Sequence, residues 1–307
     1  MLNVDYNINK SQNSSVNNSH VYRSLLASLS NFAVYNLINS NIKSEIFRQI
    51  LKDSFTNSEK YNAEYKKAID KSYRFSGLKD KGIKIIDASK VNDKEIFNII
   101  KKDIPLYYKF TKNNYKKALI IINNMTKQIK AGKNGIFVKN DNTIIVNFEK
   151  RSITFFHELG HSANKFSYIC KFLQKIRGGI SKFTYPIFLI TAIFPKDNNK
   201  NANLPYKIID FIANNCVLLT MLSVAPTIIE ESIATLNGLK FAKPFLNNKI
   251  FKKLCAHNLR LLSCYYTSAI LTLLSMKIIS LTKKYIESNR WKFLLILIQE
   301  YLFFVLY

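Results

Sequence analysis

The segment from Thr154 to Ala163, TFFHELGHSA, contains two histidines four positions apart, with a glutamate directly after the first. An α-helix turns by about 100° per residue, so His157 and His161 would lie one above the other on the same helix face. Two neutral imidazoles in this arrangement can bind one metal ion, and Glu158 stands beside the first of them. The pattern predicts a helix that binds zinc and carries a carboxylate able to activate a water molecule.

The residues around this motif favour a buried helix. Phe155, Leu159 and Gly160 are uncharged, as a helix inside an active site requires, and the whole chain has only 4 histidines. The alternative is a surface helix on which two histidines coincide by chance. The small number of histidines makes that coincidence less probable than a metal site.

The charge of the chain is strongly basic and comes almost entirely from lysine. Its 307 residues are 48% hydrophobic and 21% charged, with a net charge of +26, which indicates a globular or membrane-associated protein rather than a disordered one. A basic excess can serve an anionic membrane or a nucleic acid. The lysines are spread along the chain without a dense basic stripe or a nucleic-acid-binding motif, so nucleic acid is not an expected partner.

A β-hairpin is predicted directly before the motif. β-Branched runs at 134–138 and 143–148 flank the polar residues 139–142. A strand so close to a metal-binding helix can hold an extended peptide across the site by main-chain hydrogen bonds. An ordinary hairpin packed on a helix is the alternative. Farther upstream, the pattern predicts a strand at 82–88, helices at 93–104 and 113–131, and a helix stop at Gly132.

Apolar segments dominate the chain after the motif. The longest, Ile208–Ile229, contains Asp210 as its only charged residue and is long enough to cross a bilayer as a helix, which takes about 20 residues. Shorter apolar segments lie at 183–195, 261–276 and 293–307. These segments form either a membrane bundle or an unusually apolar helical core, and the sequence favours the membrane.

The positive-inside rule gives an orientation for such a bundle. The connector at 196–207 carries fewer basic residues than the stretches at 165–182 and 240–260. Basic flanks stay on the cytoplasmic side of a membrane. We therefore expect a multi-pass protein whose catalytic face is cytoplasmic.

A catalytic zinc site needs a third protein ligand and one open position. His20 lies in a polar tail, and His257 lies in a predicted helix rich in Lys, Cys and Leu, so neither is the best candidate. Glu230 and Glu231 follow the longest apolar run directly, where two acids are costly to desolvate unless they face a cation. Either can be the third ligand. Pro226 is expected to break or start a helix there, which would place both acids in its first turns.

The stretch ESIATLNG, Glu231–Gly238, extends the pattern. It fits the form E-x-x-A-D-x-x-G, with Thr235 in place of the aspartate. In these motifs the chain resembles the gluzincin metallopeptidases, most closely the membrane group of CAAX prenyl proteases and heat-shock membrane proteases. The resemblance implies that Glu231 is the third zinc ligand. It also implies that Ala234 and Gly238 let their helix pack closely on the HExxH helix. Thr235 lies four positions after Glu231, so on a helix its hydroxyl can hydrogen-bond a metal ligand.

These observations predict a mainly α fold with a small β-hairpin or sheet, a zincin-like catalytic core and apolar, membrane-embedded C-terminal helices. The predicted function is that of a membrane-associated zinc metallopeptidase, with a peptide or protein as substrate and Glu158 as general base. The alternative is a non-enzymatic basic membrane protein with a chance or relic motif. The expected regions are a disordered tail at 1–19, a mainly helical region at 20–133, the catalytic core at 134–242 and apolar helices at 243–307.

Overall fold

The computed structural model describes three long stretches and several isolated positions of the chain: residues 59–104, 112–166 and 214–288, and positions 45–46, 169–170, 172–173, 207–208 and 211. The predicted tail at 1–19 and the apolar segments at 183–195 and 293–307 lie outside the described residues. So do most of the connector at 196–207 and most of the basic stretch at 165–182, on which the predicted membrane orientation depends. The division into four regions also remains a prediction.

The chain divides into two compact units. The first, which we call the HExxH unit, comprises Glu45–Lys175 and Ala225–Thr267. The second comprises Met1–Ser44, Ile176–Val224 and Ser268–Tyr307. Every residue of the predicted metal site belongs to the HExxH unit, so the site can be described within that unit alone.

A three-stranded mixed sheet lies at the centre of the HExxH unit. Its strands are β1 (Lys84–Asp87), β2 (Gly135–Val138) and β3 (Thr143–Val146), in the order β1-β3-β2. β2 pairs antiparallel with β3 across a short turn, η2 (Lys139–Asp141), which confirms the predicted hairpin. The strand predicted at 82–88 is also present, but it pairs parallel with β3, a long-range partner that the local pattern did not indicate.

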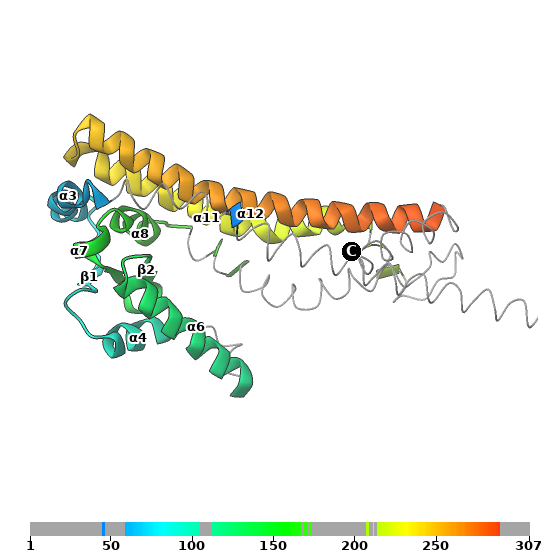
Figure 1. The fold of residues 1–307 in the computed structure, drawn as a ribbon, viewed down its shortest axis with the longest axis horizontal. Helices are drawn as coiled ribbons and strands as arrows, with labels where there is room; N and C mark the ends of the chain where they lie inside the picture. The colour runs from blue at the N-terminus through cyan, green and yellow to red at the C-terminus, as the bar shows by residue number, and fades with distance from the viewer. Residues whose placement is uncertain are drawn as a thin grey trace, which may run out of the picture. The chain divides into compact units, whose positions relative to one another are not determined.

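Helices cover both faces of this sheet. On one face, α4 (Asp93–Lys101) and α6 (Lys112–Lys130) lie side by side and bury Ile145 of β3 (Figure 1). On the other face, α3 (Asn62–Phe75) and the HExxH helix α8 (Thr154–Ser162) pack around Ile144 and Val146. Successive side chains of a strand point to opposite faces, so this fully buried strand supplies both cores.

Local sequence explains where several of these helices begin and end. Asn92 accepts a hydrogen bond from the Glu95 N–H at the start of α4, at 2.9 Å. Asn147 does the same for Lys150 at the start of the short helix α7 (Phe148–Arg151), at 3.0 Å. Gly132 has a φ of 72° just after α6 ends, which is the left-handed conformation that stops a helix, as predicted.

Two long apolar helices form the C-terminal part of the described chain. They are α11 (Cys216–Ala242) and α12 (Asn248–Ser288), joined by η3 (Lys243–Phe245). In the HExxH unit the two helices lie side by side (Figure 1). They touch where Ser232 Oγ lies 3.1 Å from Tyr266 Oη. The fold is therefore mainly helical, with a small mixed sheet and two long apolar C-terminal helices, as the sequence predicted.

Pro226 neither starts nor ends a helix, so that prediction was wrong. α11 continues through it, and Glu230 and Glu231 lie in the middle of the helix rather than in its first turns. A proline removes one main-chain hydrogen bond, at a cost of about 3 kcal/mol, and a long helix with enough packing can bear that loss. The acids are consequently held by a continuous helix on both sides.

Each of these helices is long and apolar enough to cross a membrane. The spans Cys216–Phe245 and Asn248–Ile278 reach 30 and 31 residues, and only 28% and 22% of their most apolar stretches are buried. Exposed apolar side chains on them include Leu218, Met221, Leu222, Ile270 and Leu274. Length and composition thus permit a membrane span at each helix.

Candidate metal centre

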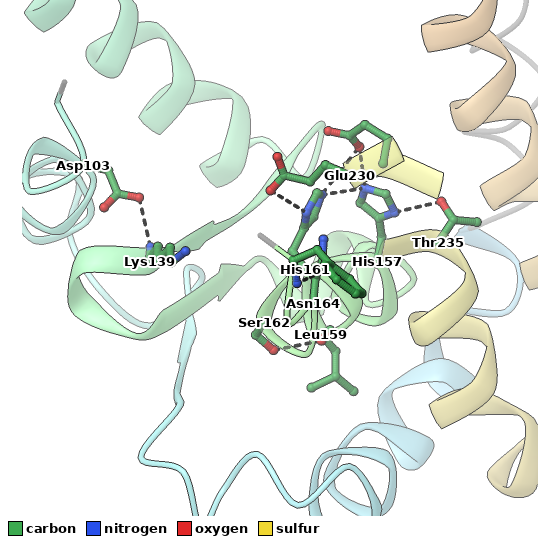
Figure 2. Close-up of polar contacts among 11 residues, drawn as sticks. Asp103, Lys139, His157, Leu159, His161, Ser162, Asn164, Glu230 and Thr235 are labelled. Atoms are coloured by element: carbon green, nitrogen blue, oxygen red, sulfur yellow. Dashed lines mark hydrogen bonds and ion pairs between the residues drawn. The ribbon is translucent and has the colours of Figure 1, made fainter. Parts of the chain in front are cut away.

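The two histidines of the motif converge as their spacing predicted. α8 is buried from Thr154 to Gly160, so its polar side chains project into the interior of the unit. His157 Nε2 and His161 Nε2 lie 3.1 Å apart, with the two rings nearly perpendicular (Figure 2). Two ring nitrogens at this distance repel each other through their lone pairs unless a proton or a cation lies between them.

Glu231 brings a carboxylate to the same point from α11. Its Oε2 lies 3.1 Å from His157 Nε2 and 3.5 Å from His161 Nε2. Zinc binds nitrogen and oxygen ligands at about 2.0–2.1 Å, so two ligand atoms of a tetrahedral site are about 3.3 Å apart. The three observed separations bracket this value. Within the described residues, this is the group of His, Cys, Asp and Glu side chains able to hold a metal ion.

Each histidine has a second polar neighbour at its other ring nitrogen. His157 Nδ1 lies 3.4 Å from Thr235 Oγ1, and His161 Nδ1 lies 3.8 Å from a carboxylate oxygen of Glu230 (Figure 2). If each Nδ1 carries the proton, each Nε2 presents its lone pair to a metal. The adjacent acids therefore have different positions, Glu231 at the Nε2 atoms and Glu230 beside Nδ1. Thr235 contacts a candidate ligand, as its spacing from Glu231 predicted.

The backbones of α8 and α11 touch at two glycines. A Cβ built on Gly160 would lie 1.8 Å from the carbonyl oxygen of Ala234, and one on Gly238 would lie 2.1 Å from that of Phe156. Real atoms cannot approach so closely, so only glycine fits at either position. This confirms the close packing expected at Ala234 and Gly238. It is this packing that brings Glu231 within reach of the histidines.

Negative charge surrounds the histidines. Glu158 and Glu230 are 8% and 6% exposed, and Glu231 is half-buried. Burial by itself would lower the pKa of His161, but the hydrogen bond to Glu231 and the charges of Glu158, Glu231 and Glu230 raise it to about 8. Buried carboxylates are stable only when they face positive charge or hydrogen-bond donors. The site is thus suited to hold a cation.

The site opens into a cleft of about 710 Å³ within the HExxH unit. β2 forms one wall of it, from Gly135 to Phe137, and among the described strands β2 is paired on one side only. Glu158 lies against this wall, since a Cβ on Gly135 would be 3.2 Å from its Cγ. The cleft therefore contains an unpaired strand edge, a buried carboxylate and the three converging side chains.

The structure brings His157, Glu158, His161 and Glu231 into this one cleft. His257, the other candidate histidine among the described residues, is buried elsewhere on α12 with its Nε2 3.4 Å from Arg151 Nη2. His20 lies outside the described residues.

Two further cleft residues were not identified from the sequence. Tyr265 of α12 lines the cleft together with Glu231. Arg151 of α7 lines the cleft as well. The chain has 17 tyrosines, and no local pattern distinguishes one of them.

Comparisons of this chain with protein-family models, with curated proteins and with solved structures found no match. The resemblance to gluzincins is therefore carried by the motifs alone. What the structure adds to it is a His-His-Glu group able to hold a metal ion, in a mainly helical protein.

Proposed function

We propose that the protein is a membrane-associated zinc metallopeptidase. The observation that carries this proposal is the convergence of His157 Nε2, His161 Nε2 and Glu231 Oε2, whose mutual separations are 3.1 to 3.5 Å. Two imidazoles and one carboxylate form a ligand set that catalytic zinc uses in hydrolases, with a fourth position left for water. Zinc bound there would lower the pKa of its water and polarise the scissile carbonyl.

Glu158 is the proposed general base. Its buried carboxylate follows His157 directly and lines the cleft, so it can accept a proton from the attacking water. The same carboxyl group then gives that proton to the amine nitrogen as the peptide C–N bond breaks. No other group is needed to balance the protons of the reaction.

Tyr265 is the proposed donor to the oxyanion that develops on the substrate carbonyl. Its side chain lines the same cleft as His157, His161 and Glu231, which places it beside the proposed ligands. A hydroxyl donor held next to the reacting carbonyl stabilises the charge of the transition state.

The substrate proposed is a peptide segment in extended form. Among the described strands β2 has one unpaired edge, its residues Gly135 to Phe137 line the cleft, and an extended chain can pair with such an edge as an added strand. This pairing would position the scissile bond through the main chain, without specific recognition of the substrate side chain at every position.

The membrane part of the proposal is supported by α11 and α12. Their apolar side chains are largely exposed, and the net charge of +26 suits an anionic lipid surface. The competing function, a non-enzymatic basic membrane protein, shares these features. It differs in predicting no stoichiometric zinc and no dependence on Glu158.

The deciding experiment combines metal analysis with one substitution. The protein is purified in detergent, its zinc is measured by elemental analysis, and hydrolysis of a peptide library is followed by mass spectrometry. Glu158→Gln should retain zinc and lose hydrolysis, whereas Glu149→Gln, an exposed glutamate on α7, should keep both. Wild-type protein without zinc, or active Glu158→Gln, would refute the proposal.

A further inference from the structure

The cleft is lined by side chains from both faces of the sheet. Phe137 packs on the core that contains α8, whereas Ile136 packs on the core that contains α6, and both side chains are half-buried and line the cleft. Gly135 faces α8 as well, because a Cβ on it would lie 3.2 Å from Glu158 Cγ. Successive residues of a strand point to opposite faces. The cleft therefore has an α8 side, where the proposed chemistry takes place, and an α6 side.

The α6 side of the cleft presents apolar surface beside β2. Met125 of α6 packs on the same core as Ile136, is half-buried like it, and lines the cleft. Ile121 lies four positions earlier, on the same face of α6, and is 54% exposed. The proposed reaction uses none of these three side chains. Their apolar surface is available to a substrate that enters the cleft.

Polar groups surround this apolar surface. Gln128 and Lys133 line the cleft and are exposed, so they lie where the cleft meets solvent. Asp103 lines the cleft too, and its carboxylate accepts hydrogen bonds from the backbone N–H groups of Lys139 and Asn140, at 2.9 and 2.8 Å. An apolar surface with a few polar groups around it is typical of a binding site.

The geometry of a strand decides which substrate side chain reaches this surface. Opposite residues of two paired strands point to the same face of a sheet, and their neighbours point to the other face. In an extended peptide paired with the edge of β2, the side chain beside Ile136 would point toward α6 and reach Met125. The side chains directly before and after it would point toward α8 and the carboxylate of Glu158.

We propose that Met125 and Ile136 are specificity-determining residues that bind one apolar side chain of the substrate. This inference rests on the proposed peptidase function and names its substrate class: extended peptides with a large apolar residue at one position near the scissile bond. Binding would remove the apolar surfaces of the substrate and of the cleft from water. A methionine side chain adapts to different shapes, so Leu, Ile, Met and Phe should all be accepted.

The test is a cleavage profile of a peptide library. Full-length protein is purified in detergent with zinc and incubated with peptides of mixed sequence, and the products are sequenced by mass spectrometry. We expect one position at which Leu or Phe is preferred to Ser or Glu by about tenfold in kcat/KM. Binding of the same peptides to Glu158→Gln protein is measured in parallel by fluorescence anisotropy and should show the same preference.

Substitutions then assign the preference to the α6 side. Met125→Glu should change it at that one position from apolar residues to Lys or Arg, a gain that loss of stability cannot produce. Ile120→Glu places the same charge on α6 at a side chain that is 61% exposed and is not among the cleft residues, so it should leave the profile unchanged. If Met125→Glu does not fold, Ile136→Thr provides the second variant. It keeps a β-branched side chain in the strand and should lose most of the apolar preference.

Three outcomes would overturn the inference: no apolar preference at any position, a preference that Met125→Glu and Ile136→Thr leave unchanged, or equal changes at directly adjacent positions. Hydrolysis without a preference that depends on these residues refutes this inference alone. Peptide binding whose preference Met125→Glu reverses, in a protein that hydrolyses no peptide, refutes the peptidase proposal alone. Absence of both binding and hydrolysis refutes both.

Discussion

Gly160 and Ala234 are in backbone contact: a Cβ on the glycine would lie 1.8 Å from the alanine carbonyl oxygen. Gly160→Ala gains about 1 kcal/mol of helix propensity, but forcing the helices apart costs about 1–3 kcal/mol or more. We expect a net loss of stability and weaker metal binding, because Glu231 moves away from the histidines together with α11. Thermal unfolding and zinc titration measure the two effects. A more stable variant with unchanged zinc affinity would contradict the packing described.

The adjacent acids of α11 should have unequal effects on metal affinity. Glu231→Gln removes a proposed ligand, and we expect the purified protein to lose its zinc. Glu230→Gln removes the same charge from the carboxylate beside His161 Nδ1, and outer partners of this kind typically contribute about 10- to 100-fold in affinity. Each variant is the control for the other in a chelator competition assay. Equal losses would contradict the expected difference, and a larger loss in Glu230→Gln would identify Glu230 as the ligand.

Zinc affinity should depend on pH through His161. The surrounding carboxylates raise the pKa of this histidine to about 8 in the metal-free protein, so at neutral pH it is largely protonated. The metal must displace that proton. We therefore expect the apparent dissociation constant to rise about tenfold for each pH unit below 8 and to level off above it. Titration between pH 6 and 9 tests this, and a constant affinity over that range would count against His161 as a ligand.

Tyr265→Phe should lower kcat about 10²- to 10³-fold while leaving zinc content unchanged, because it removes one donor to the developing oxyanion. Tyr266→Phe is the matched control, since its hydroxyl contacts Ser232 rather than the proposed ligands. The two variants are compared by steady-state kinetics and elemental analysis. If Tyr266→Phe proved equally slow, Tyr265 would have no special part in the reaction.

Local patterns predicted the features that depend on neighbouring residues. The helical spacing of His157 and His161, the hairpin before them and the stop at Gly132 all follow from side-chain periodicity or backbone conformation within a few residues. The close approach at Gly238 was anticipated through the resemblance. For these parts of the fold and the site, the local sequence was sufficient for the prediction.

Other features depend on contacts between distant residues and could not be read in this way. The parallel pairing of β1 with β3 needs a crossover through α4 and α6. Tyr265 reaches the cleft because α12 packs beside α11, which no local pattern indicates. The prediction that Pro226 breaks or starts a helix was wrong because the helix around it is long enough to continue past one missing main-chain hydrogen bond. Whether Glu230 or Glu231 faces the Nε2 atoms of the histidines depends on the direction in which each side chain points, which the sequence does not show.

The open edge of β2 also has a consequence for self-association. An unpaired strand edge can recruit the same edge of another molecule and begin aggregation. Among the described strands, the unpaired edge of β2 is only four residues long, Gly135–Val138, and Lys133 and Lys139 stand near its two ends. A second copy added antiparallel would bring lysines close to lysines. The same short, lysine-flanked edge that can accept a substrate chain therefore resists pairing with itself, which helps to keep the cleft accessible.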